Sequence, residues 1–303
     1  MRKGKILVLG TPGLVGSRFV EIYSHKYDLL TPSINELDIT DKGALFEYFG
    51  KNKISTVINF AACTDVDAAE KQRGNESGSC WKVNVEGVGN LVDVVNTDNT
   101  YLIHISTDMV FSGSQTDPGA YSEDHKLELN KQKLTWYGFT KAQGEKITSK
   151  ISGNKISILR LIYPVRARYK LKLDYLRKPL KLFDEGKLYP LFSDQQVSVT
   201  FIDEACCAIQ VLAETHRYGI FHASSTDTTS PYEITSYLIE KARGKKNVVK
   251  MTSLDEFLKK VDNPARYPKF GGLQVEATEK KLGIKFSSWR EIVDKLVEQG
   301  IEY

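Results

Sequence analysis

The chain opens on a short apolar segment that runs straight into a glycine-rich turn, and this pairing constrains its fold more than any other feature. Residues 5–9 are apolar on both faces, which is typical of a parallel strand buried inside a sheet. The turn GTPGLVG follows at residues 10–16, and residues 15–24 have helical spacing of apolar side chains. The sequence therefore predicts a strand, a tight turn and a helix, the opening of a βαβ unit.

The glycines of this turn have the spacing that holds a dinucleotide. Gly10 permits the tight turn, Gly13 lets the backbone approach a pyrophosphate, and Gly16 lets the helix pack closely on the strand. The helix start, at Leu14 and Val15, offers unpaired N–H groups and a partial positive charge to the phosphates. A bare glycine turn is the alternative interpretation, and the clean strand before it favours nucleotide binding.

Strands and helices alternate through the first half of the chain. Beyond the opening unit we expect strands at 27–31, 55–59, 101–105 and 156–161, and helices at 42–50, 81–95 and 137–149. This alternation predicts an α/β fold of Rossmann type, a doubly wound parallel sheet. After Tyr163 the pattern is irregular, with helices expected at 205–213 and 232–242, a strand at 219–223 and a last helix starting near Ser287 and Ser288. We predict an NAD(P)-binding Rossmann domain at 1–160 and a smaller C-terminal substrate-binding lobe at 161–303, with some chain crossing back.

Residues at three other places are candidates for the rest of the nucleotide pocket. Asp38 and Ile39 are placed to flank an adenine, although a loop aspartate before the next helix explains Asp38 equally well. The segment Phe60-Ala61-Ala62 follows an apolar strand, and its small residues allow close approach of a ribose. Asn84 lies at the start of the 81–95 helix, where it either lines the pocket or is a surface amide.

The end of the second strand bears on which nicotinamide cofactor is bound. It reads Thr31-Pro32-Ser33, without the acidic residue that usually holds the free 2′-hydroxyl of NAD. Ser33 or Arg18 is available to meet a 2′-phosphate instead. The sequence therefore favours NADP(H) over NAD(H).

A hydroxyl and a tyrosine–lysine pair supply the chemistry. Thr107 closes the strand at 101–105, and Tyr137 and Lys141, four residues apart, share one face of the next helix. A free tyrosine has a pKa near ~10, and a nearby ammonium favours its phenolate. Tyr137 can then donate a proton to a ketone oxygen that Thr107 also holds by a hydrogen bond. The alternative interpretation of the pair is an exposed helix, and its combination with the glycine turn favours catalysis.

Three motifs resemble those of the extended short-chain dehydrogenase/reductase superfamily and, more narrowly, dTDP-4-dehydrorhamnose reductases. They are VINFAACTDVD at 57–67, HISTDMVFSG at 104–113 and WYGFTKAQGE at 136–145. The resemblance implies reduction, by NADPH or NADH, of a ketone at position four of a nucleotide-linked 6-deoxyhexose. It implies Thr107, Tyr137 and Lys141 as catalytic residues, and it implies substrate contacts at Thr64, Val66, Asp108 and Arg266, with Tyr163 in place of a tryptophan that packs on the sugar.

The sequence argues against one related activity and leaves two other functions open. A 4,6-dehydratase needs an acid–base pair after the hydroxyl, and Asp108 is followed here by Met109, whose thioether transfers no proton, so dehydration is not expected. A nucleotide-sugar 4-epimerase with tightly bound NAD needs only the catalytic trio. A non-catalytic NADP-binding regulatory subunit, resembling the β subunit of methionine adenosyltransferase, is also compatible with it.

Charge, cysteine content and hydropathy indicate which kinds of partner the protein can bind. The net charge is +4 and the basic residues are scattered, so we expect no nucleic-acid partner. The four cysteines lack the spacing of a zinc site and suggest no disulfide framework, which fits a reducing compartment. No apolar segment approaches the ~20 residues that span a bilayer. We expect a cytoplasmic protein with a nucleotide-sugar substrate, no metal and no membrane contact, and family resemblance suggests a homodimer.

Overall fold

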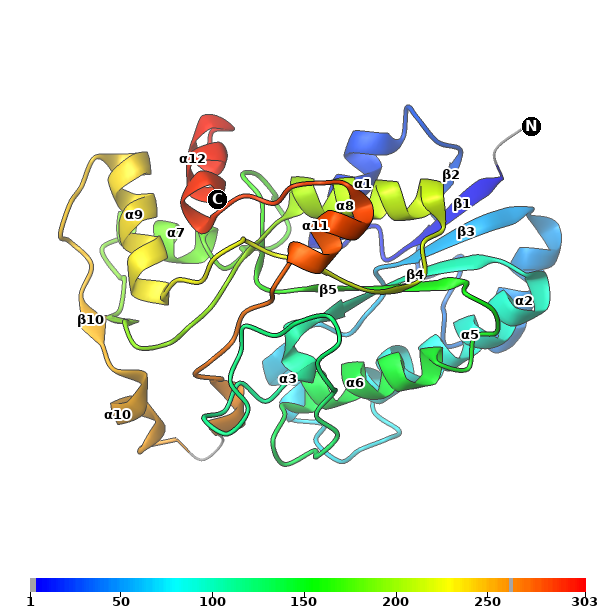
Figure 1. The fold of residues 1–303 in the computed structure, drawn as a ribbon, viewed down its shortest axis with the longest axis horizontal. Helices are drawn as coiled ribbons and strands as arrows, with labels where there is room; N and C mark the ends of the chain where they lie inside the picture. Colours follow the sequence, from blue (N-terminus) through cyan, green and yellow to red (C-terminus); the bar gives the residue numbers. More distant parts are fainter. Residues whose placement is uncertain (1–3, 262–263) are drawn as a thin grey trace. The chain divides into compact units, whose positions relative to one another are not determined.

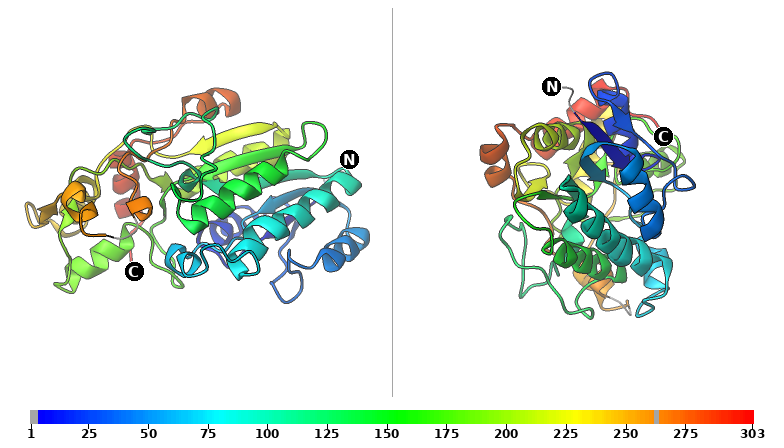
Figure 2. Two further views of the ribbon diagram at one scale, coloured as in Figure 1. Left: turned by 90° about the horizontal axis from the view of Figure 1, so that it is seen from below. Right: turned by 90° about the vertical axis from the view of Figure 1, so that its right-hand side faces the viewer.

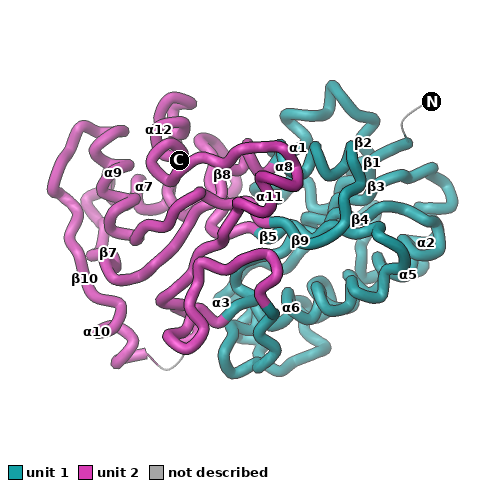
Figure 3. The backbone as a smooth tube through the Cα atoms, in the orientation of Figure 1, with its two compact units in different colours: residues 1–111, 126–160, 206–221 teal, residues 112–125, 161–205, 222–303 magenta. Residues whose placement is uncertain are grey.

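The computed structural model describes residues 4–261 and 264–303 (Figure 1). The chain divides into two compact units, neither of which is a continuous stretch of sequence (Figure 3). Unit one comprises residues 1–111, 126–160 and 206–221, and unit two comprises residues 112–125, 161–205 and 222–303. The division of the chain into domains at 1–160 and 161–303 stays a prediction.

A six-stranded sheet forms the centre of unit one, and its strand order is β2-β1-β3-β4-β5-β9. The strands are β1 Lys5–Leu9, β2 Leu29–Leu30, β3 Ile54–Asn59, β4 Tyr101–Thr107, β5 Ile156–Leu161 and β9 Gly219–Ala223. The pairs β1–β2, β1–β3 and β3–β4 are parallel. The order reverses between β1 and β3, and ligands of open α/β sheets bind at such a switch point. The predicted Rossmann-type α/β fold is confirmed.

Helices cover both faces of this sheet (Figures 1 and 2). One face carries α1 Leu14–Tyr23 and the part of α8 Ile202–Thr215 that belongs to unit one; the other carries α2 Lys42–Lys51, α5 Gly87–Asp98 and α6 Trp136–Thr148. The core under α2 and α5 is made of aliphatic and aromatic side chains that are at most 4% exposed; it includes Leu7, Leu9, Leu45, Phe49, Leu91, Val94, Val95 and Leu102. This burial supplies the main stabilisation of unit one.

Two of the expected elements differ from the structure. The second strand pairs only at Leu29 and Leu30, because the N–H of Tyr27 is still donated to the carbonyl of Tyr23 in the turn after α1 and because Pro32 has no N–H to donate. The 81–95 helix is interrupted: α4 Ser79–Trp81 continues into a π-helical turn η1 Lys82–Glu86 before α5. The wider turn aims the Asn84 side chain at the backbone of Cys63.

Unit two is built from short strands and helices around its own apolar core. Its parallel strand pairs are β6 Pro164–Val165 with β8 Thr200–Phe201 and β7 Leu191–Phe192 with β10 Met251–Thr252. Its helices include α7 Arg177–Asp184, α9 Pro231–Arg243, α10 Leu254–Leu258, α11 Glu276–Leu282 and α12 Trp289–Glu298. Ser288 caps α12, as predicted, in a capping box with Glu291. No helix in the described part of the chain combines the length and apolarity that a bilayer crossing requires.

Candidate active site

The predicted catalytic residues lie in unit one, at the end of β4 and in the first turns of α6. Thr107 is the last residue of β4, and Tyr137 and Lys141 lie one turn apart in α6. The Thr107 hydroxyl is a hydrogen-bond partner of the Tyr137 phenol. All three side chains are less than a tenth exposed, and Lys141 is only 2% exposed. The arrangement brings one hydroxyl and one phenol together at the carboxyl end of β4.

Local interactions determine where α6 begins and hence where Tyr137 lies. The Thr135 hydroxyl caps the helix by accepting a hydrogen bond from the N–H of Gly138 at 3.0 Å. The Glu70 carboxylate accepts a second one from the N–H of Trp136 at 2.9 Å. At Gly138 the helix also approaches the turn η2 Asp108–Val110 so closely that a Cβ there would lie 2.1 Å from the carbonyl oxygen of Met109. Gly138 therefore holds Tyr137 beside the end of β4.

We expect Gly138→Ala to lower kcat by at least ~tenfold, because the start of α6 must move away from Met109 and displacements near ~1 Å are costly in an active site. The matched control is Gly89→Ala in α5, where the nearest atom to an added Cβ is 3.9 Å away. That change is expected to stabilise its helix by about 1 kcal/mol and leave kcat unchanged. Steady-state kinetics and thermal unfolding of the two variants test this. Equal kcat values for the two variants would show that Gly138 does not position Tyr137.

The protein environment keeps Tyr137 in its protonated form. Burial is the main cause that raises the pKa of the phenol, and the nearby Asp108 carboxyl adds to it. The hydrogen bond with Thr107 acts in the opposite direction. The expected lowering of this pKa by Lys141 is not among the largest effects on the phenol, and the Lys141 ammonium donates to the carbonyl oxygen of Ile105. The phenol is therefore protonated at neutral pH, and a bound ligand or cofactor charge would have to lower its pKa for fast proton transfer.

Lys141 is held by β4 rather than by the tyrosine. Its ammonium donates to the carbonyl oxygen of Ile105 at 2.7 Å and lies 3.3 Å from Nε2 of His104. His104 Nδ1 lies 3.3 Å from the side-chain amide of Asn59 in β3. Burial and the charge of Lys141 hold the pKa of His104 well below its usual value, so the imidazole is neutral. Burial also lowers the pKa of Lys141 to about 8, against the opposing effect of Glu145.

Asp108 follows Thr107 directly and is buried beside it. The Thr107 hydroxyl donates to Asp108 Oδ1 at 3.1 Å. Burial raises the pKa of this carboxyl from 3.8 to about 7, and hydrogen bonds oppose the shift. An ionised Asp108 would raise the pKa of Tyr137 further, so the two groups are electrostatically linked.

We expect Asp108→Asn to remove a pH dependence of stability. Between about pH 4 and 7 the unfolded chain ionises this carboxyl while the native protein keeps its proton, so the free energy of unfolding falls as pH rises through this window. The Tm of the variant minus that of the parent protein should therefore grow from pH 4 to 7 and level off above it. Thermal unfolding at several pH values measures this difference. A difference independent of pH would contradict the buried, protonated state of Asp108.

The glycine turn has the geometry of a close approach between two strand ends. Gly10 has φ +76°, and a Cβ there would lie 2.6 Å from the backbone nitrogen of Ala61 in the turn after β3. A Cβ at Gly16 would lie 2.7 Å from the carbonyl oxygen of Gly10, so this glycine packs on the turn itself. Gly13 is the N-cap residue of α1, and within the described residues no side chain caps that helix start. The turn therefore presents backbone, rather than side chains, at the switch point of the sheet.

The other candidate cofactor residues have mixed surroundings. Asp38 is half-buried and accepts from the N–H of Thr40 at 2.8 Å, which agrees with its interpretation as a loop residue. Ile39 is 4% exposed and belongs to the core. The surface interpretation of Asn84 is wrong, because Asn84 is 1% exposed and hydrogen-bonded to the backbone of Cys63 and to Thr140. Phe60, Ala61 and Ala62 follow β3 and are partly buried at the same switch point.

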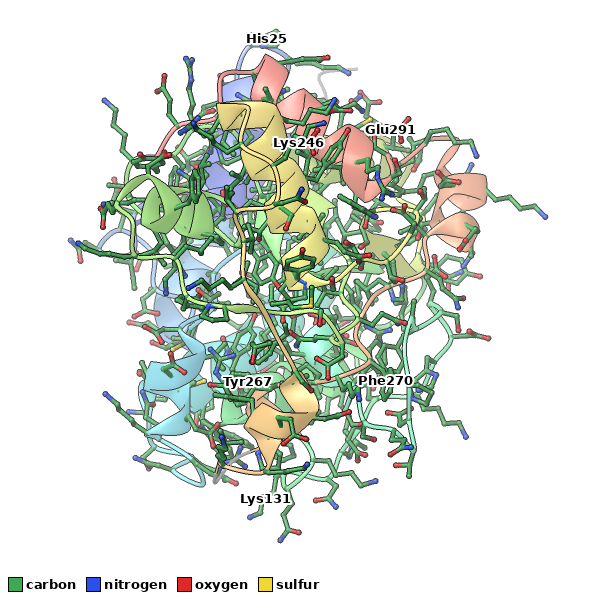
Figure 4. All side chains as sticks on the ribbon, turned by 90° about the vertical axis from the view of Figure 1, so that its left-hand side faces the viewer. His25, Lys131, Lys246, Tyr267, Phe270 and Glu291 are labelled. Carbon is green, nitrogen blue, oxygen red and sulfur yellow. The ribbon has the colours of Figure 1, made fainter. Side chains whose placement is uncertain are left out.

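The predicted substrate residues fall in both units. In unit one, Thr64 is exposed, and Val66 begins the short helix α3 Val66–Glu70 and packs against the apolar cluster that contains Tyr137. In unit two, the ring of Tyr163 stacks on Tyr175 with centroids 4.1 Å apart. The Arg266 guanidinium lies 5.7 Å from the ring centroid of Tyr267, which Figure 4 labels. Their contact with a substrate stays a prediction.

Comparison with known proteins identifies the family. The sequence matches the family model described as "RmlD substrate binding domain" over residues 4–301. The chain belongs to this family.

Relatives and solved structures of similar sequence or fold agree with this membership. The chain is 28% identical over 302 residues to a dTDP-4-dehydrorhamnose reductase from Aggregatibacter actinomycetemcomitans, covering 96% of this chain and 98% of the relative. It is 26% identical to the spore coat polysaccharide biosynthesis protein SpsK of Bacillus subtilis, covering 97% of both. A Bacillus anthracis dTDP-4-dehydrorhamnose reductase, solved in complex with NADP, has the same fold, with a TM-score of 0.82, 24% identity and coverage of 98% and 99%. The resemblance indicated by the three motifs is confirmed.

Three residues that support the site of this RmlD-family chain were not singled out from the sequence. They are Gly138, His104 and Glu145, of which the last pairs with Arg160 inside the protein. A glycine directly after the candidate tyrosine was a signal for Gly138, since glycine in a helix interior is costly without a packing reason. A histidine in an otherwise apolar strand was a signal for His104. Within the described residues, no group of three or more His, Cys, Asp or Glu side chains is placed to hold a metal ion.

Proposed function

We propose that this RmlD-family protein is an NADP(H)-dependent reductase that acts on the C4 ketone of a 4-keto-6-deoxy nucleotide sugar. The observation that carries the proposal is the position of the Tyr137 phenol, which is buried and hydrogen-bonded to Thr107 at the end of β4. Relatives that match nearly the whole chain are named as dTDP-4-dehydrorhamnose reductases, which is the same activity. A reductase needs a proton donor at this position, and the Tyr137 phenol carries the proton that the reduction requires.

The residues at the switch point fit a dinucleotide. The turn at Gly10 and Gly13 presents bare backbone, and the start of the ten-residue helix α1 supports an anion through its dipole. The backbone at Gly13, Leu14 and Val15 would hold the pyrophosphate, with Gly16 packed beneath the turn, and Phe60, Ala61 and Ala62 would line the ribose. A bound nicotinamide cofactor supplies the hydride for the reaction.

Each member of the trio has a separate task in the reduction. Thr107 orients the ketone oxygen by a hydrogen bond, and Tyr137 donates its proton to that oxygen as the alkoxide develops. The Lys141 ammonium, fixed on the Ile105 carbonyl, places a positive charge near the phenol as it loses its proton. Asn84 and Thr140 hold the chain segments behind the site in place.

NADP(H) is the proposed cofactor, although Glu36 lies near the site of its 2′-phosphate. The N–H and hydroxyl of Ser33 both donate to Glu36 Oε2 at 2.8 Å, and Arg18 pairs with Glu21 at 3.2 Å. The Glu36 side chain is exposed to solvent, so it can rotate away and leave Ser33 free to bind the phosphate. The Bacillus anthracis reductase of the same fold was solved with NADP.

The test is steady-state oxidation of NADPH with a dTDP-4-keto-6-deoxyhexose, compared with NADH at equal concentration. We expect turnover with a lower KM for NADPH. Firm binding of NADPH without turnover would overturn the reductase proposal and favour the regulatory function. Product formation without net oxidation of the cofactor would favour the epimerase. Cytoplasmic location and a homodimer remain predictions, which cell fractionation and sedimentation test.

A further inference from the structure

Two cysteines of unit one, Cys63 and Cys80, lie against each other; we call them the thiol pair. Cys63 follows β3, and Cys80 is the central residue of α4. The Cys63 thiol is a hydrogen-bond partner of the Cys80 thiol, and both cysteines are free. Cys63 is partly exposed, whereas Cys80 is fully buried. The thiol pair thus combines a partly exposed cysteine with a buried one.

The side chain of Asn84 holds the two cysteines together. Its oxygen accepts from the N–H of Cys63 at 2.9 Å, and its nitrogen donates to the carbonyl oxygen of Cys63 at 3.2 Å. The same nitrogen lies 3.5 Å from Sγ of Cys80. One amide therefore fixes the backbone of one cysteine and the sulfur of the other.

The thiol pair is also in contact with the proposed active site. Cys80 belongs to the buried cluster that contains Trp136 and Tyr137, and Cys63 packs against this cluster. Sγ of Cys80 lies 3.4 Å from the hydroxyl of Thr140, and that hydroxyl donates to the carbonyl oxygen of Tyr137 at 2.8 Å. These contacts connect the Cys80 sulfur to the first turn of α6.

We propose that Cys63 and Cys80 form a reversible disulfide that switches the enzyme off when a peroxide is present. The effect on turnover rests on the proposed reductase function, whereas formation of the disulfide does not. An S–S bond is about 2.05 Å long, so the sulfurs must approach from hydrogen-bonding distance and draw the segment after β3 toward α4. This movement acts on Asn84 and Thr140, and through them on Tyr137.

The chemistry takes place in two steps. The Cys63 sulfur attacks a peroxide oxygen: an S–O bond forms, the O–O bond breaks, and the departing hydroxide leaves as water with the thiol proton. The Cys80 sulfur then attacks the Cys63 sulfur: the S–S bond forms, the S–O bond breaks, and hydroxide leaves as a second water with the Cys80 proton. The two thiols lose two electrons in total, and the peroxide gains them.

The surroundings assign the two roles. Cys63 reacts first because it is the partly exposed member of the pair, whereas Cys80 is buried. Burial raises the pKa of Cys80 to about 11, so this thiol is protonated in the reduced pair and does not compete with Cys63 for the peroxide. A dithiol reductant reverses the reaction by thiol–disulfide exchange.

The direct test is disulfide mapping of the full-length protein after treatment with hydrogen peroxide. We expect two of the four thiols to be lost and a peptide linking Cys63 to Cys80 to appear in the mass spectrum, which dithiothreitol removes. Cys63→Ser and Cys80→Ser should not form the link. Cys207→Ser, which replaces a partly exposed thiol in α8, should form it as the parent protein does. Absence of this peptide from the oxidised parent protein would overturn the proposal.

Activity is measured on the same samples and related to each variant's own activity before oxidation. After oxidation, the turnover of the parent protein and of Cys207→Ser should fall by at least ~tenfold, and dithiothreitol should restore it. Cys63→Ser should keep its turnover. If Cys63→Ser is inactivated as much as the parent protein, the disulfide is not the cause of the inactivation, and the reductase proposal is unaffected. A link that forms in a protein without any turnover would overturn the reductase proposal and leave the disulfide standing.

Discussion

Tyr137→Phe is expected to lower kcat by about 10²–10⁴-fold, the usual contribution of a positioned general acid. The phenylalanine ring fills the same space in the buried cluster that also contains Cys80 and Trp136, so the structure around it should be kept. The variant lacks only the proton donor and the hydrogen bond with Thr107. Affinity for NADPH should therefore change little, because the glycine turn is untouched. Steady-state kinetics and cofactor titration by fluorescence measure the two quantities separately.

Tyr101→Phe is the matched control for this change. Tyr101 is also a buried tyrosine at a β4 position, 3% exposed, and its hydroxyl bonds to Ser157 and to the Arg217 carbonyl. Removing that hydroxyl should cost about 1 kcal/mol of stability and leave kcat as it is. If Tyr137→Phe has the same kcat as Tyr101→Phe, Tyr137 is not the proton donor.

Glu145→Ala is expected to lower the free energy of unfolding by about 3–5 kcal/mol. Glu145 and Arg160 are 2% and 1% exposed in their side chains, and the guanidinium binds both carboxylate oxygens, at 2.7 Å from Nη2 and 3.0 Å from Nε. Removing the carboxylate leaves a buried positive charge without this partner, and a buried charge is costly to hold. Urea unfolding followed by tryptophan fluorescence measures the loss.

The control for this prediction is an exposed pair on another helix. Lys51 and Glu47 of α2 are 70% and 67% exposed, so Glu47→Ala should change stability by no more than about 0.5 kcal/mol. Glu145 also opposes the lowering of the Lys141 pKa by burial. Its loss should therefore shift any ionisation of Lys141 in the pH–rate profile to lower pH. Comparable stabilities for Glu145→Ala and Glu47→Ala would show that the buried pair contributes little.

The sheet of unit one and the order of its elements were predictable from the sequence because they rest on local patterns. The strands β1, β3 and β4 are continuous apolar runs, and the helices between them repeat their apolar residues at helical spacing. The placing of Thr107 beside Tyr137 followed from the rule that parallel strands present their carboxyl ends at one edge. The irregular elements of unit two, such as α7 and α10, had no comparable signal because they are short and lack a repeating pattern.

The supporting contacts of the site were not predictable in the same way. His104 meets Lys141 across 37 residues of sequence, and Glu145 meets Arg160 across 15. Such partners depend on the packing of one element on another, which periodicity does not report. The expected effect of Lys141 on the tyrosine is an example: helical spacing places the two on one face, yet the ammonium is held by the Ile105 carbonyl.

The division of unit one into separated segments has a consequence for how the protein is made. Its sheet ends in β9, at Gly219–Ala223, which lies beside β5 although the chain first completes an excursion through residues 161–205. On the ribosome β5 is therefore an open edge until Gly219 has emerged, and an open edge strand pairs readily with other chains. Aggregation during synthesis is thus a hazard over this interval, and unit one reaches its final form only when most of the protein has been translated.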